Sequence, residues 1–191
     1  VVAVHLRGQY SMIHHAARHM RERGWGRIIN MASEAWRGTV GQANYGAAKM
    51  GIAGLSRIIA MEGERNNVRS NCLAPVAWTR MTQSVPVKDE AAAKRREVMA
   101  QTIRPDQPAR LSVALVAPSA AHISGQVFGA SGENIILYSQ PRPIATQTKD
   151  TGWSVDTILS EAMPAMADKF FPLSRPPLAS QGGAAPAKQG A

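Results

Sequence analysis

The chain has 191 residues, of which 45% are hydrophobic and 18% are charged, a balance typical of a globular domain with a sizeable core. Its single cysteine, Cys72, excludes an intrachain disulfide and a cysteine-based zinc site, and favours a reducing compartment. We recognise no secretory signal pattern and no apolar stretch of membrane-spanning length. We therefore expect a cytoplasmic protein without a membrane partner.

The net charge of +9 and the pI near 10.4 raise the question of a nucleic-acid partner. The basic residues are scattered, however, and the densest group, residues 94–96, lies among Asp89, Glu90 and Glu97 in a helix-like pattern. This pattern is typical of a solvated helix face, and an aromatic content of 5% does not favour base stacking. We expect no nucleic-acid partner, although a positive surface would suit an acidic substrate such as an acyl-CoA.

Four elements follow one another in the first 75 residues. Apolar residues at three- and four-residue steps predict an amphipathic helix over residues 2–22, which Gly24 ends. The short apolar run in GRIINMA predicts a buried strand over residues 26–32. Residues 42–62 are rich in alanine and glycine and predict a second helix with close backbone contacts, and the alternation in NVRSNCLAP predicts a strand over residues 67–75.

The next elements continue the alternation of strands and helices. A loop is expected over residues 76–86, helices over residues 88–101 and 107–121, and a strand over residues 125–130. Strands that alternate with helices favour parallel pairing. The sequence therefore predicts an α/β fold.

The composition changes near the carboxyl terminus. Residues 176–191 lack the apolar side chains that would offset the entropy of ordering, so we expect a disordered Pro/Gly/Ala-rich tail there. The preceding residues, 1–175, are expected to form one domain. We find no internal repeat.

A tyrosine and a lysine stand four positions apart in GQANYGAAKMG, as Tyr45 and Lys49. On a helix this spacing puts both side chains on one face. A free tyrosine is a poor base at neutral pH, but an ammonium group a few ångströms away favours the phenolate. Ser33 follows the strand expected over residues 26–32, at the edge where open α/β sheets place their ligands. The three groups can therefore converge on one site.

Three stretches, GRIINMAS, GQANYGAAKMGIAGLSRIIAMEGERNNVRSNCLAP and TRMT, stand in an order that resembles the catalytic half of the short-chain dehydrogenase/reductase family. The resemblance covers about residues 1–130. Within the family, VHLRG, GQANY and WTRMT are similar to the (3R)-hydroxyacyl-CoA dehydrogenase and 3-oxoacyl reductase-like branch. The resemblance implies a Rossmann-like, doubly wound parallel sheet and an oxidoreductase acting on a hydroxyl/carbonyl substrate, with a hydroxyacyl or oxoacyl thioester as the expected class.

The resemblance also implies roles for individual residues. Tyr45 would be the general acid/base, and Lys49 would favour its phenolate form. Ser33 would hydrogen-bond the substrate oxygen and stabilise the charge that develops on it. His5 stands where the family usually carries an asparagine that feeds a proton relay, a role that histidine can also serve.

The cofactor implied by the resemblance is NAD or NADP, which would carry the hydride. Tyr45 and Lys49 would contact it, with Lys49 binding the nicotinamide ribose hydroxyls. Pro75, Val76 and Thr79 match the stretch that lines the nicotinamide ring and its carboxamide. The sequence does not distinguish NAD from NADP.

Two features depart from the family pattern. The segment between Ser33 and Tyr45 is one residue shorter than the common spacing. No G-x-x-x-G-x-G opens a helix, so the amino-terminal dinucleotide-binding half that normally precedes this region is expected to be missing, and we expect a truncated or partial sequence. The alternative is a non-catalytic family member that acts as an oligomerisation or interaction module.

Two further expectations concern partners. The small-residue face of residues 43–54 suits contact with a second copy of the chain, so we expect a homo-oligomer, either a dimer or a tetramer. His15 and His19 have a metal-compatible spacing, but no third ligand accompanies them. We expect no metal site.

Overall fold

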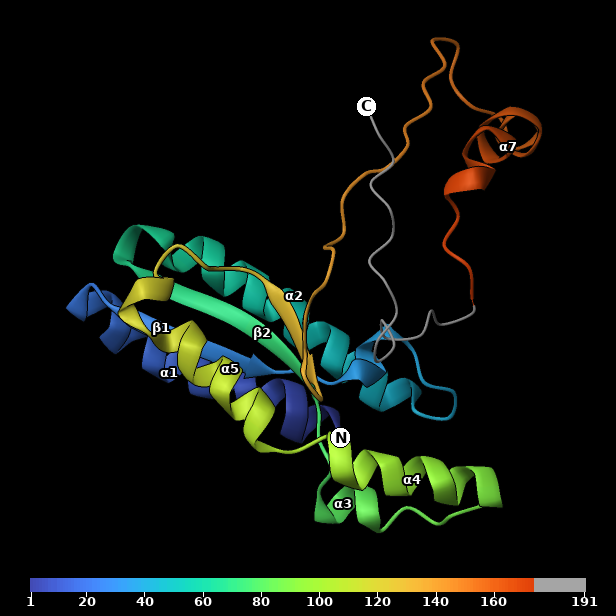
Figure 1. Cartoon of the computed structure of the whole chain (residues 1–191). Coiled ribbons are helices and arrows are strands. Elements are labelled where there is room, and N and C mark those ends of the chain that lie inside the picture. The colour runs from blue at the N-terminus through green and yellow to red at the C-terminus, as the bar shows by residue number, and fades with distance from the viewer. Residues whose placement is uncertain (174–191) are drawn as a thin grey trace, which may run out of the picture. The chain divides into compact units, whose positions relative to one another are not determined.

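The computed structural model describes residues 1–173, which belong to two units, Val1–Ser139 and a second unit that begins at Gln140 (Figure 1). The tail expected over residues 176–191 lies outside the described residues. The first unit contains every residue proposed for the site and is described first.

The first unit is built on a four-stranded sheet in the order β1-β2-β3-β4. Strands β1 (Gly26–Met31), β2 (Val68–Val76) and β3 (Val127–Ser131) are parallel, and β4 (Asn134–Leu137) is antiparallel to β3. The parallel order confirms the predicted α/β fold. Strand β4 was not expected; it follows a turn at Gly132, whose φ of 56° favours glycine.

The four helices predicted from the sequence are present over most of their length, but the loop expected over residues 76–86 contains a short helix at residues 80–83, so that prediction is wrong there. Helix α1 ends where Gly24 takes a left-handed φ of 64°, and a π-helical turn, Ala3–Arg7, precedes it. The prediction for residues 107–121 is wrong at its end, because Ala117, which precedes a proline, is extended. The observed helices are α1 (Gly8–Arg23), α2 (Ala43–Gly63), α3 (Arg80–Gln83), α4 (Glu90–Thr102) and α5 (Asp106–Val116).

Helices cover both faces of the sheet, and β2 supplies side chains to both. Cys72 and Ala74 pack with Ile52 of α2 in one buried cluster, whereas Leu73 packs with Leu111 of α5 in another. Successive residues of a strand point to opposite faces, and Figure 1 shows α2 and α5 on either side of β2. The sheet is therefore enclosed where the parallel strands meet.

A buried polar chain joins α2 to the sheet. Asn30 Nδ2 donates to Ser70 Oγ at 3.0 Å, and Ser56 Oγ lies 3.1 Å from the same oxygen. All three residues are at most 2% exposed. Because buried polar groups need partners, these contacts fix the register of α2 over β1 and β2.

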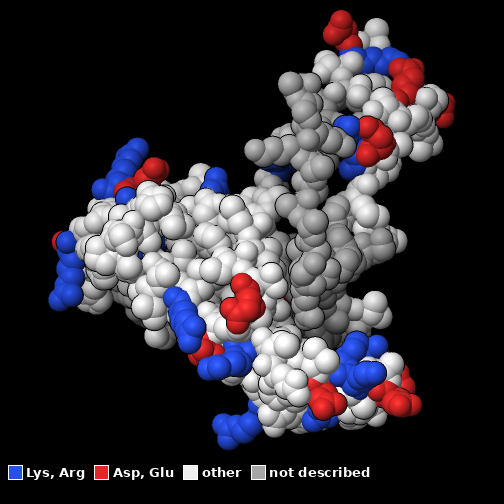
Figure 2. All heavy atoms as spheres, viewed as in Figure 1, with Lys and Arg blue, Asp and Glu red and all other residues white. Residues whose placement is uncertain are grey.

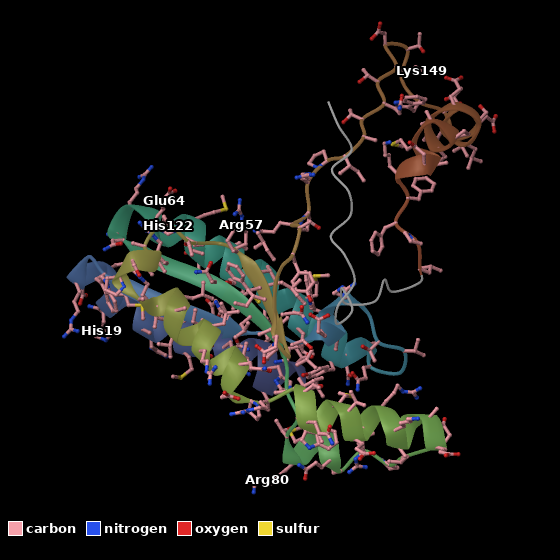
Figure 3. The ribbon with its side chains drawn as sticks, viewed as in Figure 1. His19, Arg57, Glu64, Arg80, His122 and Lys149 are labelled. Carbon is pink, nitrogen blue, oxygen red and sulfur yellow. The ribbon has the colours of Figure 1, made fainter. Side chains whose placement is uncertain are left out.

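The second unit is described to residue 173 and contains short helical segments. These are α6 (Val155–Thr157), a π-helical turn (Ile158–Ala162), α7 (Met163–Met166) and a 3-10 turn (Ala167–Lys169). Lys149, labelled in Figure 3, places its ammonium group 2.6 Å from Glu161 Oε2. This ion pair links the segment before α6 to the helical segments.

The surface charge is dispersed. Figure 2 shows lysine and arginine side chains spread over the visible face, with acidic side chains between them. Within residues 1–173, no helix combines the length and the apolar character that crossing a membrane would require.

Candidate functional site

The candidate site lies at the carboxyl ends of β1 and β2. Ser33 stands two residues beyond the end of β1, and Pro75 and Val76 complete β2. In Figure 3, Arg80, the first residue of α3, lies beyond this edge, whereas Glu64 lies towards the opposite end of the unit. Parallel sheets bind their ligands at the carboxyl edge.

Lys49 is tied to the end of β1. Its side chain is only 5% exposed, and its Nζ donates a hydrogen bond of 2.9 Å to the Met31 carbonyl oxygen. Burial lowers the pKa of Lys49, and the nearby Cys72 side chain opposes this shift. The ammonium group is thus held at a defined place rather than solvated.

Tyr45 lies one helical turn before Lys49. The Lys49 Nζ is 5.5 Å from the centre of the tyrosine ring, a cation–π distance. The His5 ring meets the same tyrosine edge-on, with 5.2 Å between ring centres. Burial and the Lys49 charge lower the pKa of His5. Three residues proposed from the sequence therefore lie together.

Ser33 follows β1 and is the N-cap of a 3-10 turn, Glu34–Arg37. Its Oγ accepts a hydrogen bond of 3.3 Å from the Ala35 backbone N–H, so it serves as a cap. Accepting this bond uses a lone pair of the hydroxyl, which can still donate its proton. The cap and a role towards substrate are therefore compatible.

Thr79 lies where β2 leads into α3. Its Oγ1 accepts from the Thr82 N–H at 3.5 Å, while its own N–H donates to Thr82 Oγ1 at 2.6 Å. The Trp78 N–H donates to the Ile103 carbonyl at 2.7 Å, which ties this segment to the end of α4. Pro75 and Val76 are half-buried and Thr79 is exposed. The structure gives Thr79 a capping role.

The described part of the chain contains no group of three or more His, Cys, Asp or Glu side chains placed to hold a metal ion. His15 lies on α1 with its ring exposed, and His14 meets it edge-on, with 5.2 Å between ring centres. The ring contacts of His14 are with His15 and Tyr10, not with Tyr45 or His5.

The sequence reasoning missed a buried group directly after Ser33. Glu34 is 7% exposed; Arg37 Nη1 lies 3.2 Å from its Oε2, and the Tyr138 hydroxyl donates to its Oε1. Burial and the Glu34 carboxylate raise the pKa of Tyr138. The turn in SGEN and the apolar run after it could have predicted β4, which brings Tyr138 to this place, but no local pattern pairs it with Glu34.

The fold and the site together define a class of protein: an α/β chain that presents a serine, a tyrosine and a lysine at the carboxyl edge of a parallel sheet. A family profile described as "Enoyl-(Acyl carrier protein) reductase" matches residues 1–132. The chain belongs to the short-chain dehydrogenase/reductase family, which confirms the prediction from its motifs. This family uses a nicotinamide cofactor.

Two relatives and one solved structure show the extent of the similarity. The peroxisomal multifunctional enzyme type 2 of Mus musculus is 42% identical over 101 residues, 52% of this chain and 14% of that protein. A hydroxyacyl-CoA dehydrogenase of Mycobacterium tuberculosis is 37% identical over 150 residues, 74% of this chain and 46% of that protein. A crystal structure of a short chain dehydrogenase from Mycobacterium avium matches with a TM-score of 0.63 and 35% identity, over 88% of this chain and 55% of the other. The chain thus spans about half or less of the length of these proteins.

Proposed function

We propose that the protein is a nicotinamide-dependent oxidoreductase that interconverts a hydroxyl and a carbonyl group on an acyl thioester such as an acyl-CoA. The observation that carries the proposal is the buried Lys49 ammonium, held at the end of β1 with the Tyr45 ring 5.5 Å away. The relative named a hydroxyacyl-CoA dehydrogenase supports the thioester class. The dispersed positive charge of the chain suits an anionic CoA.

The residues present fit the nicotinamide end of NAD or NADP. Lys49 Nζ carries three donors, and its bond to Met31 uses one of them, so two can reach ribose hydroxyls. Pro75 and Val76, at the end of β2, offer a wall for the ring, and Thr79 a hydroxyl for the carboxamide. When bound, the cofactor supplies or accepts the hydride at the substrate carbon. We propose no preference between NAD and NADP.

The chain's own residues would manage the proton. In the reducing direction the Tyr45 phenol donates its proton to the carbonyl oxygen, and Lys49 stabilises the phenolate that remains. The Ser33 hydroxyl donates a hydrogen bond to the same oxygen and stabilises its developing charge. His5, edge-on to Tyr45, would return a proton from solvent. Oxidation runs through the same groups in reverse.

Turnover can be followed through the absorbance of the reduced nicotinamide, with the protein at its native length and a 3-oxoacyl-CoA as substrate. Tyr45→Phe should lower kcat by about 100-fold or more, because general acid/base catalysis contributes that much. Tyr10→Phe is the matched control, since Tyr10 is 53% exposed and lies on α1. Unchanged turnover in Tyr45→Phe would remove Tyr45 from the mechanism.

The competing proposal is a non-catalytic interaction module. It rests on the 21-residue helix α2, which is rich in alanine and glycine. Fluorescence titration with NADH and with NADPH separates the two proposals. Saturable binding of either nucleotide at micromolar concentration would count against the module.

We also propose that the protein is a homo-oligomer, either a dimer or a tetramer, formed through α1 and α2. A hollow of about 740 Å³ lies between these helices, and Ile58 on its wall is 55% exposed. Apolar exposure of this kind marks interaction surfaces. Light scattering should show a multiple of the chain mass, reduced to the monomer by Ile58→Glu. The buried, unpaired Cys72 suits the reducing cytoplasm, which we propose as the compartment.

A further inference from the structure

A buried carboxylate lies directly after Ser33. Glu34 is 7% exposed and contacts two side chains from different parts of the first unit: Arg37, 3.2 Å away within the same turn, and Tyr138, whose hydroxyl donates to it. A charge taken out of water is costly unless it is paired and hydrogen-bonded. The partners therefore determine where the Glu34 side chain, and with it the turn, can lie.

Tyr138 is itself held in place. Its backbone N–H donates to the Val127 carbonyl at 2.9 Å, which continues the pairing beyond β4. Its ring meets Trp36 edge-on, with 5.3 Å between ring centres. Gly129 leaves room for it, because a Cβ there would lie 3.0 Å from the Tyr138 hydroxyl oxygen. The sheet thus aims this hydroxyl at the turn.

The opposite side of the same turn rests on α2. The Ala35 carbonyl oxygen lies 3.1 Å from where a Cβ would stand at Gly46, the residue that follows Tyr45. The turn that begins at Ser33 is therefore held between Tyr138 of the sheet and the helix that carries Tyr45.

We propose that Glu34, Arg37 and Tyr138, together called the Glu34 cluster, are positioning residues that set the Ser33 hydroxyl relative to the Tyr45 phenol. The inference rests on the proposed oxidoreductase function and deepens it. The cluster touches neither substrate nor cofactor in this scheme. It acts through the turn, so that Ser33 and Tyr45 can contact one substrate oxygen together.

The test compares Tyr138→Phe and Glu34→Gln with Tyr10→Phe in the protein at its native length. With the nicotinamide nucleotide that supports turnover, Tyr138→Phe should lower kcat about tenfold and leave the KM for that nucleotide within twofold. The primary isotope effect on kcat with the deuterated nucleotide should rise, because a misplaced donor slows the chemical step. A lower fraction of folded protein would not change an isotope effect. Glu34→Gln should act in the same direction and Tyr10→Phe should have no effect.

Hydrogen exchange supplies a readout that does not depend on activity. The backbone N–H groups of Ala35 and Trp36 donate to Ser33, so loosening the turn should speed their exchange at least tenfold in Tyr138→Phe, with the amides of α5 unchanged. Unchanged exchange at these two amides overturns the cluster's role, whatever the turnover. Faster exchange with wild-type turnover and isotope effect overturns its role in catalysis. Faster exchange in a protein whose wild type shows no turnover sustains the positioning of the turn and refutes the oxidoreductase proposal.

Discussion

Replacing Gly46 by alanine tests how closely the Ser33 turn must approach α2. A Cβ at Gly46 would lie 3.1 Å from the Ala35 carbonyl oxygen, whereas ordinary contacts begin at 3.4 Å. The turn or the helix must therefore move by about 0.3 Å, since close-packed interiors leave no slack. A misplacement of about 1 Å can cost about 100-fold in rate, so we expect kcat to fall about fourfold.

The control lies on the same helix. A Cβ at Gly54 meets nothing within 4 Å, and alanine is favoured over glycine in a helix by about 1 kcal/mol. Gly54→Ala should therefore raise the free energy of unfolding by about 1 kcal/mol and leave kcat unchanged. Gly46→Ala gains the same helix propensity, but the close contact between the new Cβ and the Ala35 carbonyl oxygen offsets this gain. Its free energy of unfolding should therefore be no higher than that of the wild type.

Urea unfolding and the nicotinamide absorbance assay measure the two quantities on the same samples. Equal stability and equal kcat in Gly46→Ala and Gly54→Ala would refute the reasoning, because the two sites would then be equivalent. A large loss of stability in Gly46→Ala would show that the turn cannot yield at all.

Three further changes test the core. Burial raises the pKa of Cys72 from 9.0 to about 11. The thiol of the unfolded chain ionises at the lower pH, so the Cys72 contribution to the free energy of unfolding should fall by up to about 3 kcal/mol as the pH rises from 9 to 11. Urea titrations of the wild type and Cys72→Ala at each pH isolate this contribution, because the raised pKa of Tyr138 acts in both proteins. Leu115→Ala should lower the free energy of unfolding, measured with urea, by about 2–5 kcal/mol, because Leu115 is 3% exposed. Val113 is 68% exposed on the same helix, so Val113→Ala should change the free energy of unfolding by no more than about 0.5 kcal/mol. Ser70→Ala should cost about 1–3 kcal/mol, since it leaves the buried Asn30 amide without its acceptor; a thermal melt equal to the wild type would contradict this.

The parts of the fold that the sequence predicts are those with a local period. The run from Ile28 to Met31 and residues 67–75 do contain β1 and β2. Burial in β2 does not alternate, however, because helices cover both faces of the sheet there and every residue from Ser70 to Ala74 is buried. The sequence predicts that Tyr45 and Lys49 lie close together, because residues four positions apart on a helix share one face. The cation–π contact between them agrees with that geometry.

The parts of the fold that the sequence does not predict depend on tertiary contacts or on how a proline affects the backbone beside it. Helix α5 ends early because Pro118 follows Ala117 and disfavours helical geometry there. Strand β2 continues through Pro75 to Val76, although a proline usually ends a strand. From the sequence alone, Glu34 would be taken as a solvent-exposed residue in a loop. Its burial is explained by its contacts with Arg37 and with the distant Tyr138.

The hydrogen bond between Glu34 and Tyr138 joins residues that are 104 positions apart in the chain. Contacts of such separation form late, because the entropy of closing a long loop must be overcome before they can stabilise anything. The side chains of Ser33, Tyr45 and Lys49 leave the ribosome well before Tyr138 does. We expect the nascent protein to form β1, α2 and β2 around these residues before the turn at Ser33 becomes rigid, so that the proposed site is completed in the last step of folding.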